Sequence, residues 1–314
     1  MIDKEMRILT YNFSAMKFLD ISETESESIL SVNRTKEFRK MLERVLSGER
    51  YESETESDER CCRFIANPVF AEDQTIGAVI VILDVTESVN REKLRREFTS
   101  NVSHELKTPL TSISGFAEIM KNGDTPDEMI VDFSNSIYNE AQRLISLVSD
   151  IMKISELDER SVVYEKETVD LYALSLEIAT RLHGEADKKK IKINVIGDTA
   201  EIIGVRKILD EIVYNLCDNA IKYNKDNGVV DIIISSAGDK VKLTVSDTGI
   251  GIPVSQQNRV FERFYRIDKA RSKAIGGTGL GLAIVKHGAM YHDAVISLES
   301  QENVGTSVSV IFEM

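Results

Sequence analysis

The sequence predicts an α+β protein of several domains, because three regions with different periodicity follow one another along the chain. Residues 1–86 have the pattern of short strands and loops, residues 87–158 are continuously helical in pattern, and residues 160–314 alternate helices with strands. The length of 314 residues agrees with two or three domains, since one domain takes roughly 100–200 residues. We expect a small α/β domain, a helical hairpin and an α/β two-layer sandwich.

The first region should contain a hairpin of two strands, at Cys61 to Phe70 and at Ile76 to Asp84. The second strand is apolar almost throughout, as is typical of a central strand. Two stretches rich in Ser and Glu, 22–28 and 52–59, are predicted to be solvated loops.

The second region should be a pair of helices. Apolar residues recur every three to five positions from Thr86, which predicts one long helix with an apolar seam, and the Gly and Pro between Lys121 and Pro126 should end it. A second helix, capped by Thr125 or Asp127, should run to about Leu157. Two helices of one chain cannot bury the apolar seams of both helices. We therefore expect a homodimer whose two hairpins form a four-helix bundle.

The third region is predicted to be a layered α/β domain. A long irregular stretch should separate the strand that ends at Asp247 from the last helix. Helices are expected at 171–189, at 205–223 and from about 279, and strands at 191–196, 229–235, 241–247, 294–299 and 307–312.

Composition excludes several classes of function. A net charge of -13 argues against a nucleic-acid-binding protein, because phosphate backbones require basic patches. No apolar run reaches the ~20 residues of a membrane span, and the N-terminus lacks the pattern of a signal peptide. Three cysteines give neither a disulfide framework nor metal-ligand spacing. We expect a cytoplasmic protein, or the cytoplasmic portion of a membrane-anchored sensor.

One face of the helix predicted at 205–223 is polar. Asn215, Asn219 and Lys222 lie four and three residues apart, and the apolar residues occupy the opposite face. Such a stripe is often only a solvated surface. Two amide oxygens beside a lysine would also suit Mg²⁺ and a polyphosphate, by supplying an oxygen ligand and a cation.

Asp247 ends a strand in which alternation places it on the same face as three apolar residues. A carboxylate on an apolar face needs a hydrogen-bond donor, and the exocyclic amine of adenine is one. Gly249 and Gly251 would let the backbone pass close to a flat base. The alternative is an aspartate that only starts a turn.

A glycine-rich loop, Gly276 to Leu282, enters the last helix and offers free N–H groups to an anion. It lacks the Lys-Ser/Thr pair of a Walker loop and the spacing of a dinucleotide fingerprint.

Together these segments resemble, in order and spacing, the ATP-binding domain shared by sensor histidine kinases, gyrase, the Hsp90 chaperones and MutL. The residues at 215–223 are similar to its N box, those at 247–252 to its G1 box, those at 261–266 to its F box and those at 277–282 to its G2 box. The resemblance implies that the protein uses ATP and Mg²⁺.

The resemblance also assigns roles to residues. Asn219 would hold Mg²⁺, with Asn215 and Lys222 near the phosphates, while Tyr223 would border the base and Asp247 would bind it. The stretch 252–278 would be a mobile lid, from which Arg266 can reach the phosphates. The other nucleotide-binding positions that it implies are Gly249, Gly251, Phe264, Gly277, Thr278, Gly279, Leu280, Gly281 and, as a further adenine contact, Thr306.

The first long helix carries a histidine within a recognisable motif, Phe98 to Leu110. His104 and Thr108 share a helical face, and Pro109 lacks an N–H, so the carbonyl of Glu105 loses its helical partner and the helix can kink. A lone histidine on a bundle helix is more often structural. This motif, however, resembles the H box of the HisKA group of sensor kinases.

That resemblance implies a protein histidine kinase of a two-component system. His104 would attack the γ-phosphate while Glu105 takes or orients a proton, and the phosphoryl group would pass to an aspartate of a response regulator. Thr108 would position a water that dephosphorylates the regulator. The N-terminal region resembles a PAS sensor domain, most clearly at Asp84 to Glu87, which is similar to the Asp-x-Thr exit into a signalling helix.

We therefore expect a PAS-like domain at 1–86, a dimerisation and phosphotransfer hairpin at 87–158 and a catalytic domain at 160–314. One alternative is an ATPase of the gyrase or chaperone kind that forms no phosphohistidine. Another is a binding or phosphatase protein with a weak kinase step. An acid-labile, base-stable phosphoryl bond on the protein would distinguish the kinase from the ATPase.

Overall fold

The computed structural model describes residues 1–19, 28–32, 35–57, 60–122, 126–159, 164–268 and 277–313. The chain divides into two compact units, Met1–Thr99 and Ser100–Met314. Helix α4 (Thr86–Lys121) contributes residues to both units.

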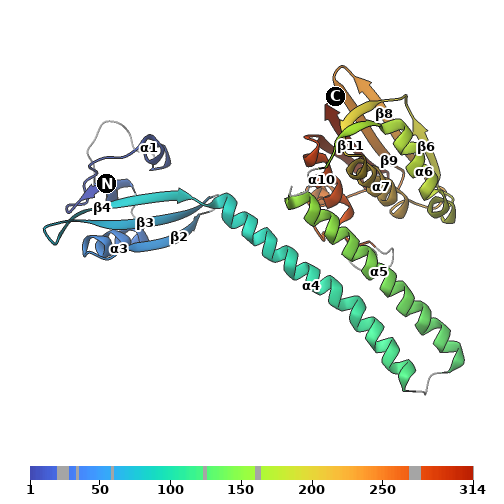
Figure 1. Cartoon of the computed structure of the whole chain (residues 1–314), viewed down its shortest axis with the longest axis horizontal. Coiled ribbons are helices and arrows are strands. Elements are labelled where there is room, and N and C mark those ends of the chain that lie inside the picture. Colours follow the sequence, from blue (N-terminus) through green and yellow to red (C-terminus); the bar gives the residue numbers. More distant parts are fainter. Residues whose placement is uncertain are drawn as a thin grey trace. The chain divides into compact units, whose positions relative to one another are not determined.

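The N-terminal unit contains a four-stranded antiparallel sheet in the order β1-β4-β3-β2 (Figure 1). Its strands are β1 (Ile2–Asp3), β2 (Tyr51–Ser57), β3 (Arg60–Ala71) and β4 (Gln74–Asp84). The predicted hairpin is confirmed, and its turn is tight because Glu72 and Asp73 both adopt positive φ.

Strand β2 shows that the prediction of a solvated loop at 52–59 is wrong for the residues that are described. Tyr51–Ser57 pairs with β3 along its length, and Glu54 on this edge strand contacts Arg63 at 2.9 Å. Glutamates at alternate positions belong to one face of a strand, so a run rich in Glu is compatible with an edge strand. Residues 58–59 lie outside the described residues, as do residues 22–27 of the loop predicted at 22–28; Ser28 forms an isolated bridge with Arg7.

Three helices in this unit were not predicted: α1 (Phe13–Leu19), α2 (Ile29–Val32) and α3 (Lys36–Leu46). The hydroxyl of Thr35 caps α3 by accepting a hydrogen bond from the N–H of Phe38. The buried face of α3 packs on the sheet and consists of Phe38, Met41, Leu42 and Val45.

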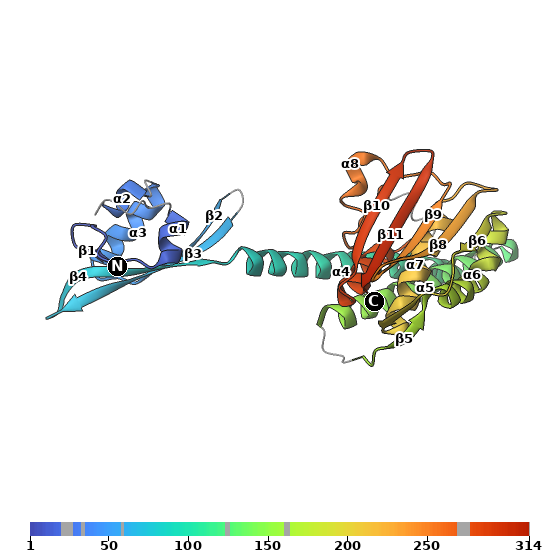
Figure 2. The ribbon, with the colours of Figure 1, turned by 90° about the horizontal axis from the view of Figure 1, so that it is seen from above.

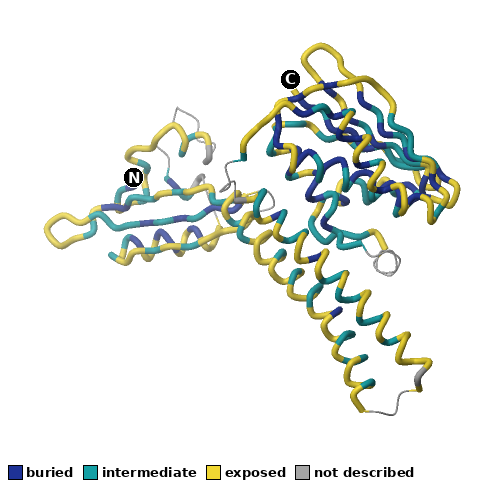
Figure 3. Tube along the Cα trace, turned by 45° about the vertical axis from the view of Figure 1, so that its right-hand side comes forward, coloured by how far each residue is buried: buried dark blue, intermediate teal, exposed yellow. Residues whose placement is uncertain are grey.

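The two long helices are present as predicted. Helix α4 runs without interruption through Pro109. Helix α5 (Asp127–Glu159) has Asp127 as its first residue, so Asp127 follows the cap position, and the other predicted cap, Thr125, lies outside the described residues. Both helices are largely exposed or half-buried along their length (Figure 3). None of the described helices combines the length and apolarity needed to cross a membrane.

The rest of the second unit is the predicted two-layer α/β domain. Its sheet has the order β10-β11-β9-β8-β6 and is antiparallel except for the pair β6 and β8 (Figure 2). The strands are β6 (Lys192–Ile196), β8 (Val229–Ala237), β9 (Lys240–Asp247), β10 (Val295–Gln301) and β11 (Gly305–Glu313).

Helices α6 (Leu171–Lys188), α7 (Arg206–Lys222) and α10 (Gly281–Tyr291) share one apolar core with this sheet. Alternate residues of β8, β9 and β11 are buried in that core, including Ile232, Leu243 and Val310. The prediction missed the small sheet of β5 (Glu167–Asp170) and β7 (Glu201–Gly204), and the short helix α8 (Val254–Gln257).

Candidate active site

A cavity of about 540 Å³ lies beside α7, against the ends of β9 and β11 and the loop that enters α10. It brings together most of the predicted nucleotide-binding residues, although they are far apart in the sequence. The predicted residues that line it are Asn215, Asn219, Lys222, Tyr223, Asp247, Gly251, Arg266, Gly277, Thr278, Gly279, Gly281 and Thr306.

At one end of the cavity Asp247 lies beside apolar lining residues such as Val245 and Val308, together with Thr306. The Asp247 Oδ1 atom accepts hydrogen bonds from the backbone N–H groups of Gly249 at 2.8 Å and of Thr306 at 3.3 Å. Among the described residues, no group donates to its Oδ2 atom. Burial raises the pKa of Asp247. A half-buried carboxylate with one acceptor oxygen available fits a ligand that carries an N–H donor on an apolar, flat body.

The glycines near Asp247 are required by close backbone contacts. A Cβ at Gly249 would lie 2.4 Å from the carbonyl oxygen of Tyr223. Gly251 has φ +67°, and its Cβ would lie 2.0 Å from the carbonyl oxygen of Gln301. Gly249 supports the cavity wall and does not line it.

The other end of the cavity holds the polar stripe of α7. Asn215 Nδ2 donates to the carbonyl oxygen of Glu211 at 2.7 Å. The Oδ1 atom of Asn215 then faces the glycine loop. A Cβ at Gly281 would lie 2.9 Å from that oxygen. Among the described residues, the Asn219 amide has no hydrogen-bond partner.

Lys222 forms an ion pair of 2.7 Å with Asp218, one turn earlier on α7. Burial alone would lower the pKa of Lys222, but the attraction of Asp218 outweighs burial and raises it. The lysine is therefore charged at neutral pH. A cation beside two amide side chains suits a polyphosphate, and an amide oxygen suits Mg²⁺.

No group of three or more His, Cys, Asp or Glu that could hold a metal ion occurs among the described residues. The donors available to a metal here are the amide oxygens of α7, single carboxylates of the lining such as Asp218, and the oxygens of a bound phosphate. That donor set fits Mg²⁺, which usually binds through few protein ligands and keeps the oxygens of its substrate.

The glycine loop and the predicted lid are tied together by their backbones. The N–H of Phe264, which has φ 62°, donates to the carbonyl oxygen of Gly279 at 2.9 Å. Gly279 has φ +75°, and Leu280 is fully buried beneath the loop. Phe264 and Leu280 thus support the loop and do not line the cavity. Residues 269–276 of the predicted lid, with Gly276, lie outside the described residues.

Arg266 connects the cavity with the first long helix. Its side chain is only 7% exposed, and Nη2 donates to the carbonyl oxygen of Thr278 at 2.8 Å and to Glu105 Oε2 at 3.0 Å. Arg143 of α5 approaches the same carboxylate oxygen at 3.6 Å. Glu105 is half-buried, whereas His104, the preceding residue, is exposed.

Thr108 and Pro109 lie one turn after His104 on α4. The Thr108 hydroxyl donates to the carbonyl oxygen of His104 at 3.2 Å, and the side chain is exposed. Pro109 is buried within the helix. His104 and Thr108 therefore share an accessible face, as their spacing predicts.

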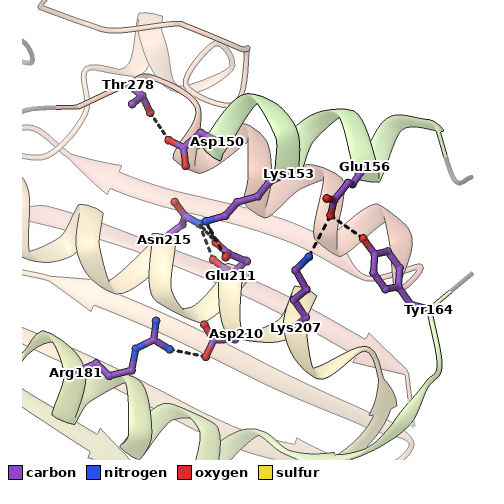
Figure 4. Close-up of polar contacts among 10 residues, drawn as sticks. All are labelled: Asp150, Lys153, Glu156, Tyr164, Arg181, Lys207, Asp210, Glu211, Asn215 and Thr278. Atoms are coloured by element: carbon purple, nitrogen blue, oxygen red, sulfur yellow. Dashed lines mark hydrogen bonds and ion pairs between the residues drawn. The ribbon is translucent and has the colours of Figure 1, made fainter. Parts of the chain in front are cut away.

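Helix α5 makes a series of polar contacts with the α/β domain (Figure 4). The hydroxyl of Thr278 donates to Asp150 Oδ2 at 2.9 Å, and Lys153 Nζ lies 2.8 Å from Glu211. Glu156 accepts hydrogen bonds from Tyr164 at 2.9 Å and from Lys207 at 3.2 Å.

A further contact lies near the end of α5. Asp158 accepts a hydrogen bond from Arg263 at 2.7 Å and lies 3.0 Å from His287 Nδ1. Burial would raise the pKa of Asp158, but His287 and Arg263 outweigh it and lower the pKa.

Two residues of α5, Ser146 and Asp150, line the cavity and were not predicted. A signal was present in the sequence, because Ser146, Asp150 and Lys153 are spaced four and three residues apart and so share a helical face. Only the apolar face of this helix was used in the prediction.

Comparison with known proteins gives two family matches. Residues 94–160 match the His Kinase A (phospho-acceptor) domain, and residues 204–314 match the histidine kinase-, DNA gyrase B- and HSP90-like ATPase. The sensor-like histidine kinase SenX3 of Mycolicibacterium smegmatis is 37% identical over 244 residues, which cover 77% of this chain and 63% of SenX3.

Two solved structures share the fold. The Acinetobacter baumannii histidine kinase AdeS aligns with a TM-score of 0.57 at 23% identity, over 67% of this chain and 98% of that one. The histidine kinase ThkA, in a complex with the response regulator protein TrrA, aligns with a TM-score of 0.54 at 22% identity, over 99% of this chain and 94% of that one.

The chain thus joins a phospho-acceptor domain to an ATPase domain, and it belongs to the two-component sensor histidine kinases. It spans less than two thirds of the length of its relative SenX3.

Proposed function

We propose that this protein binds ATP with Mg²⁺ in the cavity beside α7, transfers the γ-phosphoryl group to His104 and then passes it to an aspartate of a response regulator. The observation that carries the proposal is the contact between Arg266 and Glu105. It joins a residue that lines the cavity to the neighbour of the acceptor histidine.

Each end of the cavity has a role in this reaction. Asp247 accepts a hydrogen bond from the exocyclic amine of adenine, and Tyr223 borders the base. Asn215 and Lys222 bind phosphate oxygens, while Asn219 would hold Mg²⁺, and the metal would supply charge neutralisation for the transferring group. Gly277, Thr278, Gly279 and Gly281 supply the anion-binding loop, and Arg266 reaches the phosphates from the lid.

Transfer to His104 is a nucleophilic substitution at phosphorus. One imidazole nitrogen of His104 forms the new bond in line with the bond to the leaving group, and ADP departs with the bridging oxygen. Glu105 takes or orients the proton on the other nitrogen. The side chain of His104 is exposed, so a response regulator can reach it. Thr108 positions the water that later removes phosphate from the regulator.

Substitution of His104 tests this assignment. The His104→Gln protein should take up no label from [γ-³²P]ATP while it binds ATP with unchanged affinity, because position 104 does not line the cavity. The label on the wild-type protein should be lost in acid and kept in base. Persistent labelling of His104→Gln would refute the assignment, and ATP turnover without a protein-bound phosphoryl group would favour the ATPase alternative.

A homodimer through the helical hairpin is part of the proposal. Four apolar residues of α5 recur every seven positions and are each about 60% exposed in the single chain. They are Val131, Tyr138, Ile145 and Met152. A heptad stripe of this kind is buried when helices of two hairpins associate.

We propose for residues 1–86 a sensor domain of the PAS type, for 87–158 the phosphotransfer hairpin and for 160–314 the catalytic domain. Support for the sensor assignment comes from Thr86, whose hydroxyl donates to Asp84 Oδ1 at 2.6 Å where β4 leads into α4. Residues 160–314 produced alone should bind ATP but accept no label. If this fragment did not bind ATP, the proposed start of the catalytic domain at residue 160 would be wrong.

A further inference from the structure

The carboxylate of Asp150 lies in the nucleotide cavity, although Asp150 belongs to α5 and not to the α/β domain. Its Oδ2 atom accepts a hydrogen bond from Thr278 Oγ1 at 2.9 Å (Figure 4). Thr278 is part of the glycine loop that enters α10, where free N–H groups and the helix terminus favour an anion. Asp150 therefore places a negative charge where the loop favours a phosphate.

The surrounding cations are already paired with carboxylates. Lys222 pairs with Asp218 at 2.7 Å, Arg266 with Glu105 at 3.0 Å and Lys153 with Glu211 at 2.8 Å. Burial raises the pKa of Asp150 because desolvation disfavours its charged form, while the hydrogen bond from Thr278 and the nearby Lys153 act in the opposite direction. Two of the carboxylates that engage the phosphate-binding groups, Glu105 and Asp150, come from the helical hairpin.

We propose that Asp150 competes with the polyphosphate of the nucleotide for Thr278 and the glycine loop, so that docking of α5 and binding of phosphate oppose each other. The inference rests on the proposed function, since it assumes that this cavity binds ATP. A triphosphate next to Asp150 is repelled by it, and the repulsion grows with the number of phosphates. Nucleotide binding then moves Asp150 away from Thr278 and loosens α5 from the α/β domain.

The matched substitutions are Asp150→Asn and Glu156→Gln in the full chain. Asparagine removes the charge and still accepts from the Thr278 hydroxyl. Glu156→Gln weakens a contact between α5 and α7 that lies outside the cavity. It therefore reports what loosening of α5 does by itself. Affinities are measured by calorimetry with Mg²⁺ and a non-hydrolysable ATP analogue, with Mg²⁺ and ADP, and with adenosine.

We expect Asp150→Asn to bind the ATP analogue about fivefold to tenfold more tightly than the wild type, in keeping with removal of one partly screened like charge. The gain should be smaller for ADP and absent for adenosine. Glu156→Gln loosens α5 without removing the charge of Asp150, so its gain for the ATP analogue should be smaller than that of Asp150→Asn, and it should bind adenosine like the wild type. Comparison of the ligands within one variant separates this effect from a folding defect, which would weaken adenosine binding as well.

Three results would overturn the inference. Unchanged or weaker binding of the ATP analogue by Asp150→Asn would show that Asp150 does not oppose the phosphates, and weaker binding would point to a role in holding Mg²⁺. An equal gain for adenosine, or an equal gain in Glu156→Gln, would assign the effect to loosening of α5 alone. If the wild-type chain bound no adenine nucleotide at all, the proposed function itself would fall.

Hydrogen exchange gives a second measurement. In the wild type, the amides of α5 around Asp150 should lose protection when the ATP analogue binds and should keep it when adenosine binds. Unchanged or increased protection with the ATP analogue would contradict the competition.

Discussion

Arg266 donates a hydrogen bond to the carboxylate of Glu105 at 3.0 Å, although the two residues are 161 positions apart in the sequence. The guanidinium also donates to the carbonyl oxygen of Thr278, so one buried side chain touches both the glycine loop and the acceptor helix. In the proposed reaction, such a residue would interact with the charge of the phosphoryl group during its transfer to His104.

Substitution of Arg266 should therefore impair transfer more than binding. We expect Arg266→Gln to lower the initial rate of His104 labelling by about 10- to 100-fold, because a positioned cation stabilises the charge of the transition state. Arg259→Gln is the control, since Arg259 is exposed in the same segment and pairs with Glu262. Similar rate losses in both variants would argue against a specific role.

Asp247→Asn should weaken ATP binding by about 10- to 100-fold. Asparagine can keep the two backbone hydrogen bonds to Gly249 and Thr306, but it presents an N–H group where the carboxylate presents an acceptor. Calorimetry with Mg²⁺ATP measures the effect, and Asp231→Asn, on β8 and outside the cavity, is the control. Equal affinities in the wild type and Asp247→Asn would exclude the base contact.

The pKa of Asp247 gives a pH test. Because burial raises the pKa, protonation and loss of ATP affinity should begin at a higher pH than for an ordinary aspartate of pKa about 3.9. The folded state binds this proton more tightly than the unfolded chain, so Asp247 makes the protein less stable as pH rises from about 3.9 through the raised value. Without nucleotide, Asp247→Asn should melt at a higher temperature than the wild type at pH 7 and lose that advantage near pH 4.

Glycine substitutions separate a strained turn from an ordinary helical site. Gly251→Ala should lower the free energy of unfolding by about 1–3 kcal/mol, because of its positive φ and the clash of a Cβ with the carbonyl of Gln301. Gly184→Ala in α6 should raise it by about 0.5–1 kcal/mol, since a Cβ there meets no atom within 4 Å. Urea unfolding measures both, and changes of the same sign would contradict this reading.

Thr108→Ala should leave His104 labelling roughly unchanged and slow the dephosphorylation of a response regulator by about 100-fold, through loss of water positioning. Thr111→Ala is a matched control, because its hydroxyl makes the same kind of bond to the carbonyl four residues earlier. Equal loss of labelling and of dephosphorylation in Thr108→Ala would argue that Thr108 does not act specifically in dephosphorylation.

A charge within the heptad stripe should dissociate the dimer. Ile145→Glu is expected to raise the dimer dissociation constant by about 100-fold, which corresponds to about 2.7 kcal/mol. Leu176→Glu, at an exposed site of α6, should leave it unchanged. Analytical ultracentrifugation measures both, and a stable Ile145→Glu dimer would place the interface elsewhere.

The parts of the site that sequence predicted are those with a local pattern. Strand alternation identified Asp247, and helical spacing identified the polar stripe of Asn215, Asn219 and Lys222, which all line the cavity. The positive φ of Phe264 and the burial of Leu280 depend on the fit between loop and lid, and no local pattern encodes that fit.

The missed elements have different causes. Helix α3 was predictable, because Phe38, Met41, Leu42 and Val45 follow helical spacing after the cap at Thr35. Strand β2 was predicted to be a loop because its sequence is rich in glutamate, and runs of charged residues are typical of loops. Helical spacing places Asp150 on a polar face of α5 with Ser146 and Lys153, but its contact with Thr278 depends on the packing of α5 against the glycine loop, which that spacing does not reveal.

Much of the contact between α5 and the α/β domain consists of charged pairs at partly exposed positions, such as Lys153 with Glu211 and Arg263 with Asp158. Dissolved ions screen attractions between exposed charges, and the screening length is about 10 Å at 0.1 M salt. We therefore expect the contact between α5 and the α/β domain to weaken as ionic strength rises. In this way the salt concentration of the solution would influence how firmly α5 is docked.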